Sequence, residues 1–203
     1  PALSDISVEI LDGEFVFLIG PSGAGKTTFL RLLIRDSVPT KGDIYIDDWK
    51  INTLPASQIH LLRRKVGTVF QDFKLLTDRT VFENVALALE ILGKDDLQIA
   101  RDVDRVLELV GLEKKKYMFP QQLSAGEMQR TSIARTIVGG PKVLLADEPT
   151  GNLDSKSGGE ILQLLKQFDI VHSVGEKNEA TMKEFAAHLP KADQAHYKVV
   201  GFI

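Results

Sequence analysis

The chain has 203 residues, a length that suits one domain with its own hydrophobic core. Hydrophobic residues make up 43% of it and charged residues 26%, which excludes a disordered chain, a coiled-coil rod and a collagen-like repeat. The net charge of −3 gives no case for nucleic acid as a partner, and the absence of cysteine excludes a disulfide framework and a thiolate zinc site. No apolar run approaches the ~18 residues of a membrane-spanning helix, and the first residues do not resemble a signal peptide.

The hydrophobic pattern predicts strands that alternate with helices along the chain. Strands are expected at 15–19, 42–48, 66–70 and 143–146, and helices at 29–34, 81–92, 95–110, 125–138 and 161–168. The last part of the chain is expected to hold a strand at 169–174, a helix at 176–189 and a strand at 197–203. This alternation predicts an α/β fold with a mainly parallel sheet.

Two of the predicted helices begin with a recognisable N-terminal signal. Thr80 is followed three residues later by Glu83, and Ser124 by Glu127, which is the spacing of a capping box. In the helix over 95–110 an apolar stripe is expected to face the core, and it is made of Leu97, Ala100, Val103, Leu107 and Val110.

A glycine-rich segment follows the first predicted strand and opens the first predicted helix. It reads Gly20, Pro21, Ser22, Gly23, Ala24, Gly25, Lys26, Thr27 and matches G-x-x-x-x-G-K-[ST]. Glycines let backbone N–H groups converge on phosphate oxygens, and the following helix N-terminus adds positive potential. We expect Lys26 to reach the β- and γ-phosphates of a nucleotide, Thr27 to bind Mg²⁺ and Thr28 to contact the α-phosphate.

The apolar strand over 143–146 ends in two acids, Asp147 and Glu148. In open α/β sheets ligands bind at the carboxyl edge of the strands, which is also where the phosphate-binding segment lies. Asp147 is therefore expected to hold Mg²⁺, directly or through water, and Glu148 to activate the attacking water. An ordinary polar strand end is the alternative for this pair taken alone.

Three further segments resemble ABC-type ATPases in order and spacing. The run Leu123–Arg130 is similar to their LSGGQ signature, with Ala125 where the family usually has Gly; Gln71 resembles their Q-loop, and Gly151–Asp154 their D-loop. The resemblance covers about residues 1–168. It implies a P-loop NTPase of the ABC-ATPase fold, in one domain over 1–203, with a parallel core, an antiparallel β subdomain and a helical subdomain at about 72–138.

The resemblance also implies a mechanism and partners. In this family the ATP site is shared, so Lys26, Thr27, Gln71, Asp147 and Glu148 of one protomer would face Ser124 and Gly126 of another, in a homodimer that closes on Mg-ATP. Gln71 would be both a catalytic residue and a ligand of the Mg²⁺ ion. Residues 71–84 are the region where the family docks an integral membrane permease. An apolar groove there is expected to be formed by Phe73, Leu75, Leu76 and Phe82, with subdomain core as the alternative for each of them.

Within the family, residues 145–154 resemble a bacterial subgroup that comprises the ATPases of cell division, lipoprotein release and macrolide efflux. Residues 70–76 and 78–86 look closest to the cell-division ATPases. The resemblance implies a cytoplasmic ATPase at the inner face of the membrane, held there by its partner. A nucleotide-binding module with little turnover is the alternative, and a P-loop kinase is disfavoured by the signature and D-loop.

Two family features have no match in the chain. The adenine-stacking aromatic belongs to a strand upstream of the first residue, and the switch histidine would fall near Ala180, where there is none. His172 is a candidate for that role. Residues 169–203 form an atypical segment, which is explained either by divergence or by another origin.

Overall fold

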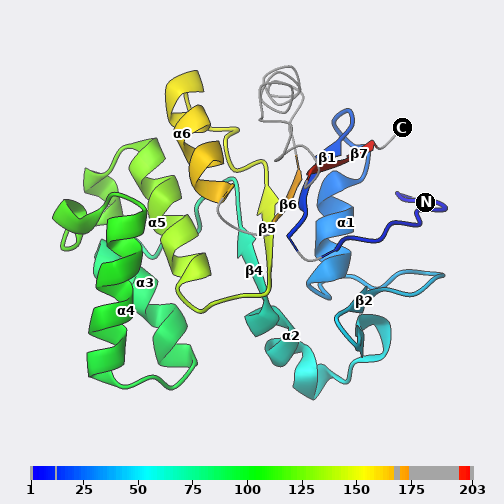
Figure 1. The fold of residues 1–203 in the computed structure, drawn as a ribbon, viewed down its shortest axis with the longest axis horizontal. Helices are drawn as coiled ribbons and strands as arrows, with labels where there is room; N and C mark the ends of the chain where they lie inside the picture. Colours follow the sequence, from blue (N-terminus) through cyan, green and yellow to red (C-terminus); the bar gives the residue numbers. More distant parts are fainter. Residues whose placement is uncertain (1, 12, 167–169, 174–196, 202–203) are drawn as a thin grey trace.

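The computed structural model describes residues 2–11, 13–166, 170–173 and 197–201. Its centre is a five-stranded sheet in the order β4-β5-β6-β1-β7, in which every neighbouring pair is parallel (Figure 1). The strands are β1 Phe15–Ile19, β4 Val66–Val69, β5 Val143–Asp147, β6 Ile170–Ser173 and β7 Tyr197–Gly201. The predicted parallel α/β fold is confirmed.

Helices cover both faces of this sheet. They are α1 Lys26–Leu33, α2 Ile59–Lys65, α3 Val81–Ile91, α4 Asp96–Leu109, α5 Ala125–Ile137 and α6 Ser155–Leu165. In Figure 1, α3, α4 and α5 lie together on one side of the molecule, and α1 lies on the other side of the sheet.

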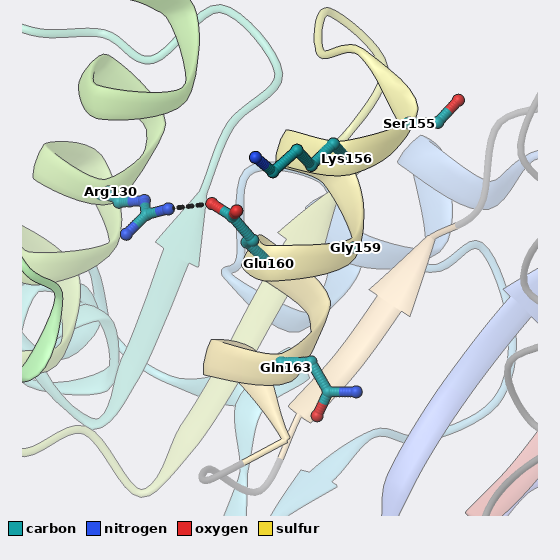
Figure 2. Close-up of a pocket in the computed structure, with 6 residues that line it drawn as sticks. All are labelled: Arg130, Ser155, Lys156, Gly159, Glu160 and Gln163. Atoms are coloured by element: carbon teal, nitrogen blue, oxygen red, sulfur yellow. Dashed lines mark hydrogen bonds and ion pairs between the residues drawn. The ribbon is translucent and has the colours of Figure 1, made fainter.

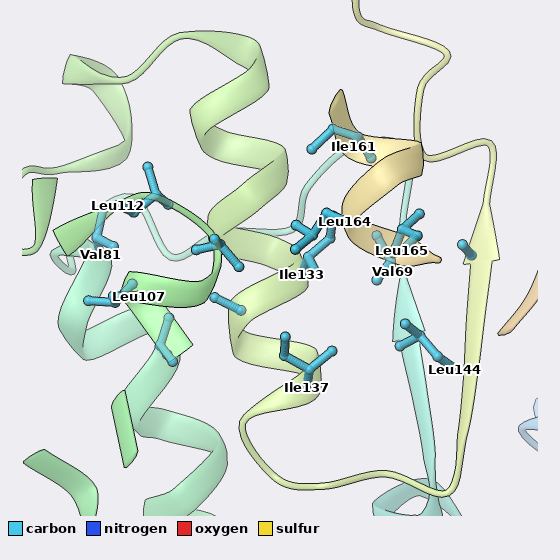
Figure 3. Packing of buried hydrophobic residues seen from close by; sticks show 14 of the residues in the cluster. Val69, Val81, Leu107, Leu112, Ile133, Ile137, Leu144, Ile161, Leu164 and Leu165 are labelled. Atoms are coloured by element: carbon cyan, nitrogen blue, oxygen red, sulfur yellow. The ribbon is translucent and has the colours of Figure 1, made fainter. Parts of the chain in front are cut away.

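The strands bury alternate side chains in two different hydrophobic clusters. Phe15 and Phe17 of β1 belong to the larger cluster, which includes residues of α3, α4, α5 and α6 (Figure 3). Val16 and Leu18 belong to the smaller cluster, which includes residues of α1 and α2. Since successive side chains of a strand point to opposite faces, a strand covered on both sides is apolar throughout. This explains the continuous apolar run of β1.

Both predicted capping boxes are present. Glu83 N donates to Thr80 Oγ1 at 3.3 Å while Thr80 N donates to the Glu83 carboxylate at 2.7 Å. Ser124 and Glu127 make the same reciprocal pair at 3.3 and 2.9 Å at the start of α5. These bonds satisfy N–H groups that have no partner inside the helix.

The structure corrects three details of the sequence prediction. The segment 42–48 is not one strand: β2 Tyr45–Ile46 and β3 Trp49–Lys50 form a short antiparallel hairpin, because Asp47 turns the chain with a φ of 51°. Leu97 is 85% exposed, and Ile99 takes its place on the buried face of α4. Helix α6 begins at Ser155 and is capped by Asp154, earlier than the apolar residues indicated.

The final predictions fall partly outside the described residues. The two strands expected at 169–174 and 197–203 are confirmed over Ile170–Ser173 and Tyr197–Gly201. The helix expected at 176–189 and the position of Ala180 lie outside the described residues. Among the described helices, none combines the length and the hydrophobicity needed to cross a bilayer.

Candidate active site

The phosphate-binding segment connects β1 to α1, as expected from the sequence. Gly25 is the N-cap of α1 with a φ of 97°, a conformation that side chains disfavour. A Cβ at this position would also lie 2.5 Å from Leu3 Cδ2 and 2.7 Å from the Ala2 carbonyl oxygen. Gly23, at a φ of 81°, faces open space instead. Glycine is thus required at Gly25 by both conformation and packing, while Gly23 leaves the backbone open to a ligand.

Lys26 is held inside the curve of this segment. Its side chain is buried, and Nζ donates to the carbonyl oxygens of Gly20 at 2.7 Å and Pro21 at 3.1 Å. A buried ammonium needs such partners. The segment therefore presents a fixed cation beside the N-terminus of α1, which is the arrangement that binds phosphate groups.

Two oxygen ligands converge beside Lys26. Thr27 Oγ1 donates to Asp147 Oδ1 at 3.2 Å, although the two residues are 120 positions apart. A hydroxyl and a carboxylate are ligands that suit Mg²⁺, so this donor set fits the ion that the sequence pattern implies. Asp147 is the last residue of β5, and Glu148 follows outside the strand with a φ of 45°. The chain therefore turns at Glu148, so strand alternation does not hold its carboxylate on the face opposite that of Asp147.

Gln71 reaches the same edge of the sheet from β4. Val69 of β4 is level with Ala146 of β5, so the residues after both strands emerge together. Asn152 Nδ2 donates to the Gln71 carbonyl oxygen at 3.0 Å. The Gln71 amide lies over Gly151, where a Cβ would be 2.8 Å from Gln71 Nε2. The structure thus brings Gln71 together with the segment that follows Glu148.

The predicted signature residues lie at the start of α5. Ser124 is exposed, and its N–H group lowers the pKa of the Glu127 carboxyl, with Lys115 as a further cause. Gly126 lies against Ser157 of α6, where a Cβ would make ordinary contact at 3.5 Å. The capping role of Ser124 is therefore real, and its exposure is compatible with a second role toward another molecule.

Sequence reasoning gave no role to Gln129, which α5 buries completely. Its Nε2 donates to the Pro149 carbonyl oxygen at 2.7 Å and so connects the signature helix to the chain just after Glu148. Its place inside the signature motif was the one available signal.

Two surface depressions lie away from these residues. The first is on the outer side of α6, where Figure 2 shows the ion pair between Arg130 and Glu160 joining α5 to α6. The second is a groove of about 570 Å³ between the C-terminal part of α1, β4, α3 and the end of α5. Its lining includes Ile34, Phe70, Ile91 and the arginines Arg31, Arg63, Arg64 and Arg135.

His172 lies in β6 at the register position of Ala146 and Phe17. Because Ala146 directly precedes Asp147 on β5, His172 lies one register position before Asp147.

The parallel sheet, the phosphate-binding segment and the carboxylates after β5 together define a P-loop nucleotide-binding domain. The family model described as "ABC transporter" matches residues 3–151, and the chain belongs to this family. Among curated proteins, the chain is similar to the cell division ATP-binding protein FtsE. Identity is 52% over 168 residues with that of Bacillus subtilis and 52% over 169 residues with that of Mycobacterium tuberculosis. Both matches cover 83% of this chain and 74% of the relative.

Solved structures agree with this assignment. A dimeric structure of MJ0796, a bacterial ABC transporter cassette, superposes with a TM-score of 0.78 at 37% identity, covering 87% of this chain and 81% of that one. CbiO1 of Clostridium perfringens, part of the cbiONQ transporter complex, gives a TM-score of 0.81 at 30% identity, covering 89% and 74%. The ABC-ATPase fold expected from the sequence is therefore confirmed.

Proposed function

We propose that the chain is the Mg²⁺-dependent ATPase subunit of a membrane complex of the FtsE type, acting in cell division. The observation that carries this proposal is the pairing of the Thr27 hydroxyl with the Asp147 carboxylate beside the buried Lys26 ammonium. A cation, a helix N-terminus and two oxygen ligands for Mg²⁺ are what a nucleoside triphosphate requires.

In the proposed hydrolysis of ATP, each residue of the site has a separate role. The backbone of residues 20–25 and Lys26 bind the phosphates, with Thr28 at the α-phosphate. Thr27, Asp147 and Gln71 would hold Mg²⁺, which neutralises charge on the phosphate oxygens. Glu148 takes a proton from the attacking water, whose oxygen bonds to the γ-phosphorus. The bond from that phosphorus to the β–γ bridging oxygen breaks, giving ADP and phosphate.

A second copy of the chain completes the site in this proposal. Ser124 and Gly126 at the N-terminus of α5 would face the γ-phosphate bound by the partner. The exposure of Ser124 and the dimeric MJ0796 structures support this arrangement. ATP then favours the closed dimer, and hydrolysis releases it.

The membrane partner is proposed to be an integral permease of the FtsX type, which would hold the chain at the cytoplasmic face. The groove beside β4 supports a docking surface, since Phe70 and Ile91 line it and residues 71–84 continue from it. Among the four residues expected to form an apolar groove, Phe82 packs against the larger cluster, as in the core alternative. Leu76 is 37% exposed and could still contact a partner.

The test compares Glu148→Gln and Lys26→Ala with the unchanged chain, measuring steady-state phosphate release, ATP binding and size in solution. Glu148→Gln is expected to lose turnover by at least about a hundredfold, since general base catalysis contributes that much. It should keep ATP binding and form a dimer with Mg-ATP. Lys26→Ala is expected to lose ATP binding.

Three outcomes would contradict parts of this proposal. Unchanged turnover in Glu148→Gln would remove Glu148 as the base. ATP binding without hydrolysis by the unchanged chain would favour the nucleotide-binding module. Hydrolysis by a species that stays monomeric with ATP would exclude the shared site.

A further inference from the structure

The segment 71–80 is irregular backbone that is held by side chains from outside the segment. Asn84 is fully buried on α3, and its Nδ2, whose two N–H groups are shared among three acceptors, lies 2.9 to 3.0 Å from the carbonyl oxygens of Leu76, Arg79 and Thr80. Its Oδ1 accepts from Leu76 N at 2.8 Å. Gln121 donates to the Thr77 carbonyl oxygen at 2.8 Å. These bonds fix the C-terminal half of the segment. The half that carries Gln71 depends on other contacts.

The backbone just after Gln71 adopts an unfavourable conformation. Phe73 has a φ of 57° and Lys74 a φ of 50°, both in the left-handed region. Residues with side chains are uncommon there, and such a strained conformation persists only where the surrounding structure holds it. Two consecutive positions of this kind therefore need an external constraint.

Arg135 supplies that constraint. Its guanidinium donates to the Phe73 carbonyl oxygen at 3.0 Å and to the Lys74 carbonyl oxygen at 2.7 Å. A planar guanidinium presents two parallel N–H donors, which suits two neighbouring carbonyl groups. The Arg135 side chain is half-buried, so the two carbonyl oxygens accept hydrogen bonds that water would otherwise accept.

Arg135 lies near the end of α5, the same helix that has Ser124 as its N-cap. One end of this helix thus carries the predicted signature, and the other holds the segment that carries Gln71. Arg135 also lines the groove beside β4 together with Phe70. The contact therefore lies between three proposed features: the signature helix, Gln71 and the docking surface.

We infer that Arg135 is a positioning residue for Gln71: by holding the Phe73 and Lys74 carbonyls it fixes the backbone that places the Gln71 amide at the active site. This inference rests on the proposed ATPase function. Arg135 itself contacts neither substrate nor metal, so its effect passes through Gln71.

A double-mutant cycle with Gln71→Ala tests this. Arg135→Met alone is expected to lower kcat about tenfold with little change in the KM for ATP, since a misplaced catalytic group costs rate rather than binding. In the Gln71→Ala background the same substitution should lower kcat by less than about twofold, because Gln71 is already absent. Arg135→Lys keeps one donor group and should fall between Arg135→Met and the unchanged chain.

The chain offers a matched control in Arg35. Its guanidinium also donates to two consecutive carbonyl oxygens, those of Ile51 at 3.0 Å and Asn52 at 3.1 Å, but in a segment remote in sequence from Gln71. Arg35→Met should lower thermal stability without lowering kcat by more than about twofold. An equal loss of kcat in Arg35→Met, or an undiminished effect of Arg135→Met in the Gln71→Ala background, would overturn the inference.

Hydrogen exchange separates this inference from the proposed function. Without nucleotide, amides of residues 72–76 should exchange faster in Arg135→Met than in the unchanged chain or in Arg35→Met. If the unchanged chain does not hydrolyse ATP, the ATPase proposal fails while this measurement still reports whether Arg135 holds the segment. Unchanged exchange at 72–76 would refute the role of Arg135 directly.

Discussion

Gln71 and Gly151 form a contact in which only glycine fits without displacing a neighbour. The Gln71 amide lies over Gly151, and Asn152 holds the Gln71 carbonyl oxygen at 3.0 Å. A methyl group on Gly151 would be 2.8 Å from Gln71 Nε2 and 3.3 Å from the Glu148 carbonyl oxygen. Because the backbone carbonyl is harder to move, the amide is the group that must shift.

We predict that Gly151→Ala lowers kcat for ATP about tenfold while ATP binding stays within about twofold, because the displaced group is Gln71 and not the phosphate-binding segment. Steady-state phosphate release and equilibrium nucleotide binding measure the two quantities. A parallel loss of binding would show that the substitution disturbs more than Gln71.

Gly159→Ala is the matched control for this substitution. Gly159 lies within α6, and a Cβ there would meet nothing within 4 Å. The change should leave kcat unaltered and stabilise the fold by about 0.5–1 kcal/mol, since Ala is the better helix former.

At the scale of the elements, acidic residues stabilise helix N-termini, among them those of α3, α5 and α6. Hydrogen bonds from Thr80, Ser124 and Ser157 are the first causes that lower the pKa of Glu83, Glu127 and Asp154 respectively. A carboxyl whose pKa is lower in the folded chain than in the unfolded chain stabilises the folded state at pH values above its unfolded-state pKa. This contribution to stability is lost as the pH falls through the folded-state pKa.

The pH dependence of stability should therefore change in Glu127→Gln. The thermal unfolding midpoint of the unchanged chain should fall as the pH drops below 4.5, the ordinary pKa of a glutamate carboxyl. Glutamine keeps a capping acceptor but has no proton to gain, so the variant should lose less of its midpoint over the same range. Identical acid profiles would show that Glu127 does not contribute to this loss.

The sequence could predict the starts of α3 and α5 because a capping box involves residues only three apart. It did not predict the start of α6 at Ser155, where the cap is Asp154 alone. Helix α2 had no such signal, and the hairpin of β2 and β3 depends on Asp47, which accepts from Lys65 and Lys142 at 3.1 and 2.9 Å. Leu97 was misplaced because helical periodicity alone does not say which of two adjacent apolar stripes is buried against the neighbouring helices α3 and α5.

At the scale of the whole molecule, one cluster joins the helices α3 and α4 to the sheet. Leu107 of α4 and Leu144 of β5 belong to the same cluster, and both are almost completely buried (Figure 3). The boundary predicted for a helical subdomain at about 72–138 thus crosses a shared core. A shared core favours one cooperative unfolding transition.

We predict that Leu107→Ala lowers the free energy of unfolding by about 2–5 kcal/mol in a single urea transition with an unchanged slope. Leu97→Ala is the control on the same helix, and its effect should stay within about 0.5 kcal/mol because Leu97 is 85% exposed. A separate early transition in Leu107→Ala would show that the helical part unfolds independently.

The phosphate-binding segment and the two carboxylates could be predicted because each is a contiguous motif next to an apolar strand. The contacts that hold the segment after Gln71 could not, because Arg135 is 61 and 62 positions away from its two acceptors and Asn152 is 81 positions from Gln71. Such pairs follow only from the packing of α5 against the sheet beside β4. No local pattern encodes them.

The position of β4 at one edge of the sheet has a consequence for solubility. An open strand edge can pair with another chain and begin aggregation. Arg63, Arg64 and Lys65 precede this strand directly, so a second copy would bring like charges together. High salt screens this repulsion. The proposed permease, if seated in the groove that β4 lines, would cover this strand. The chain alone should therefore precipitate more readily as the ionic strength rises, which light scattering in a salt series would measure.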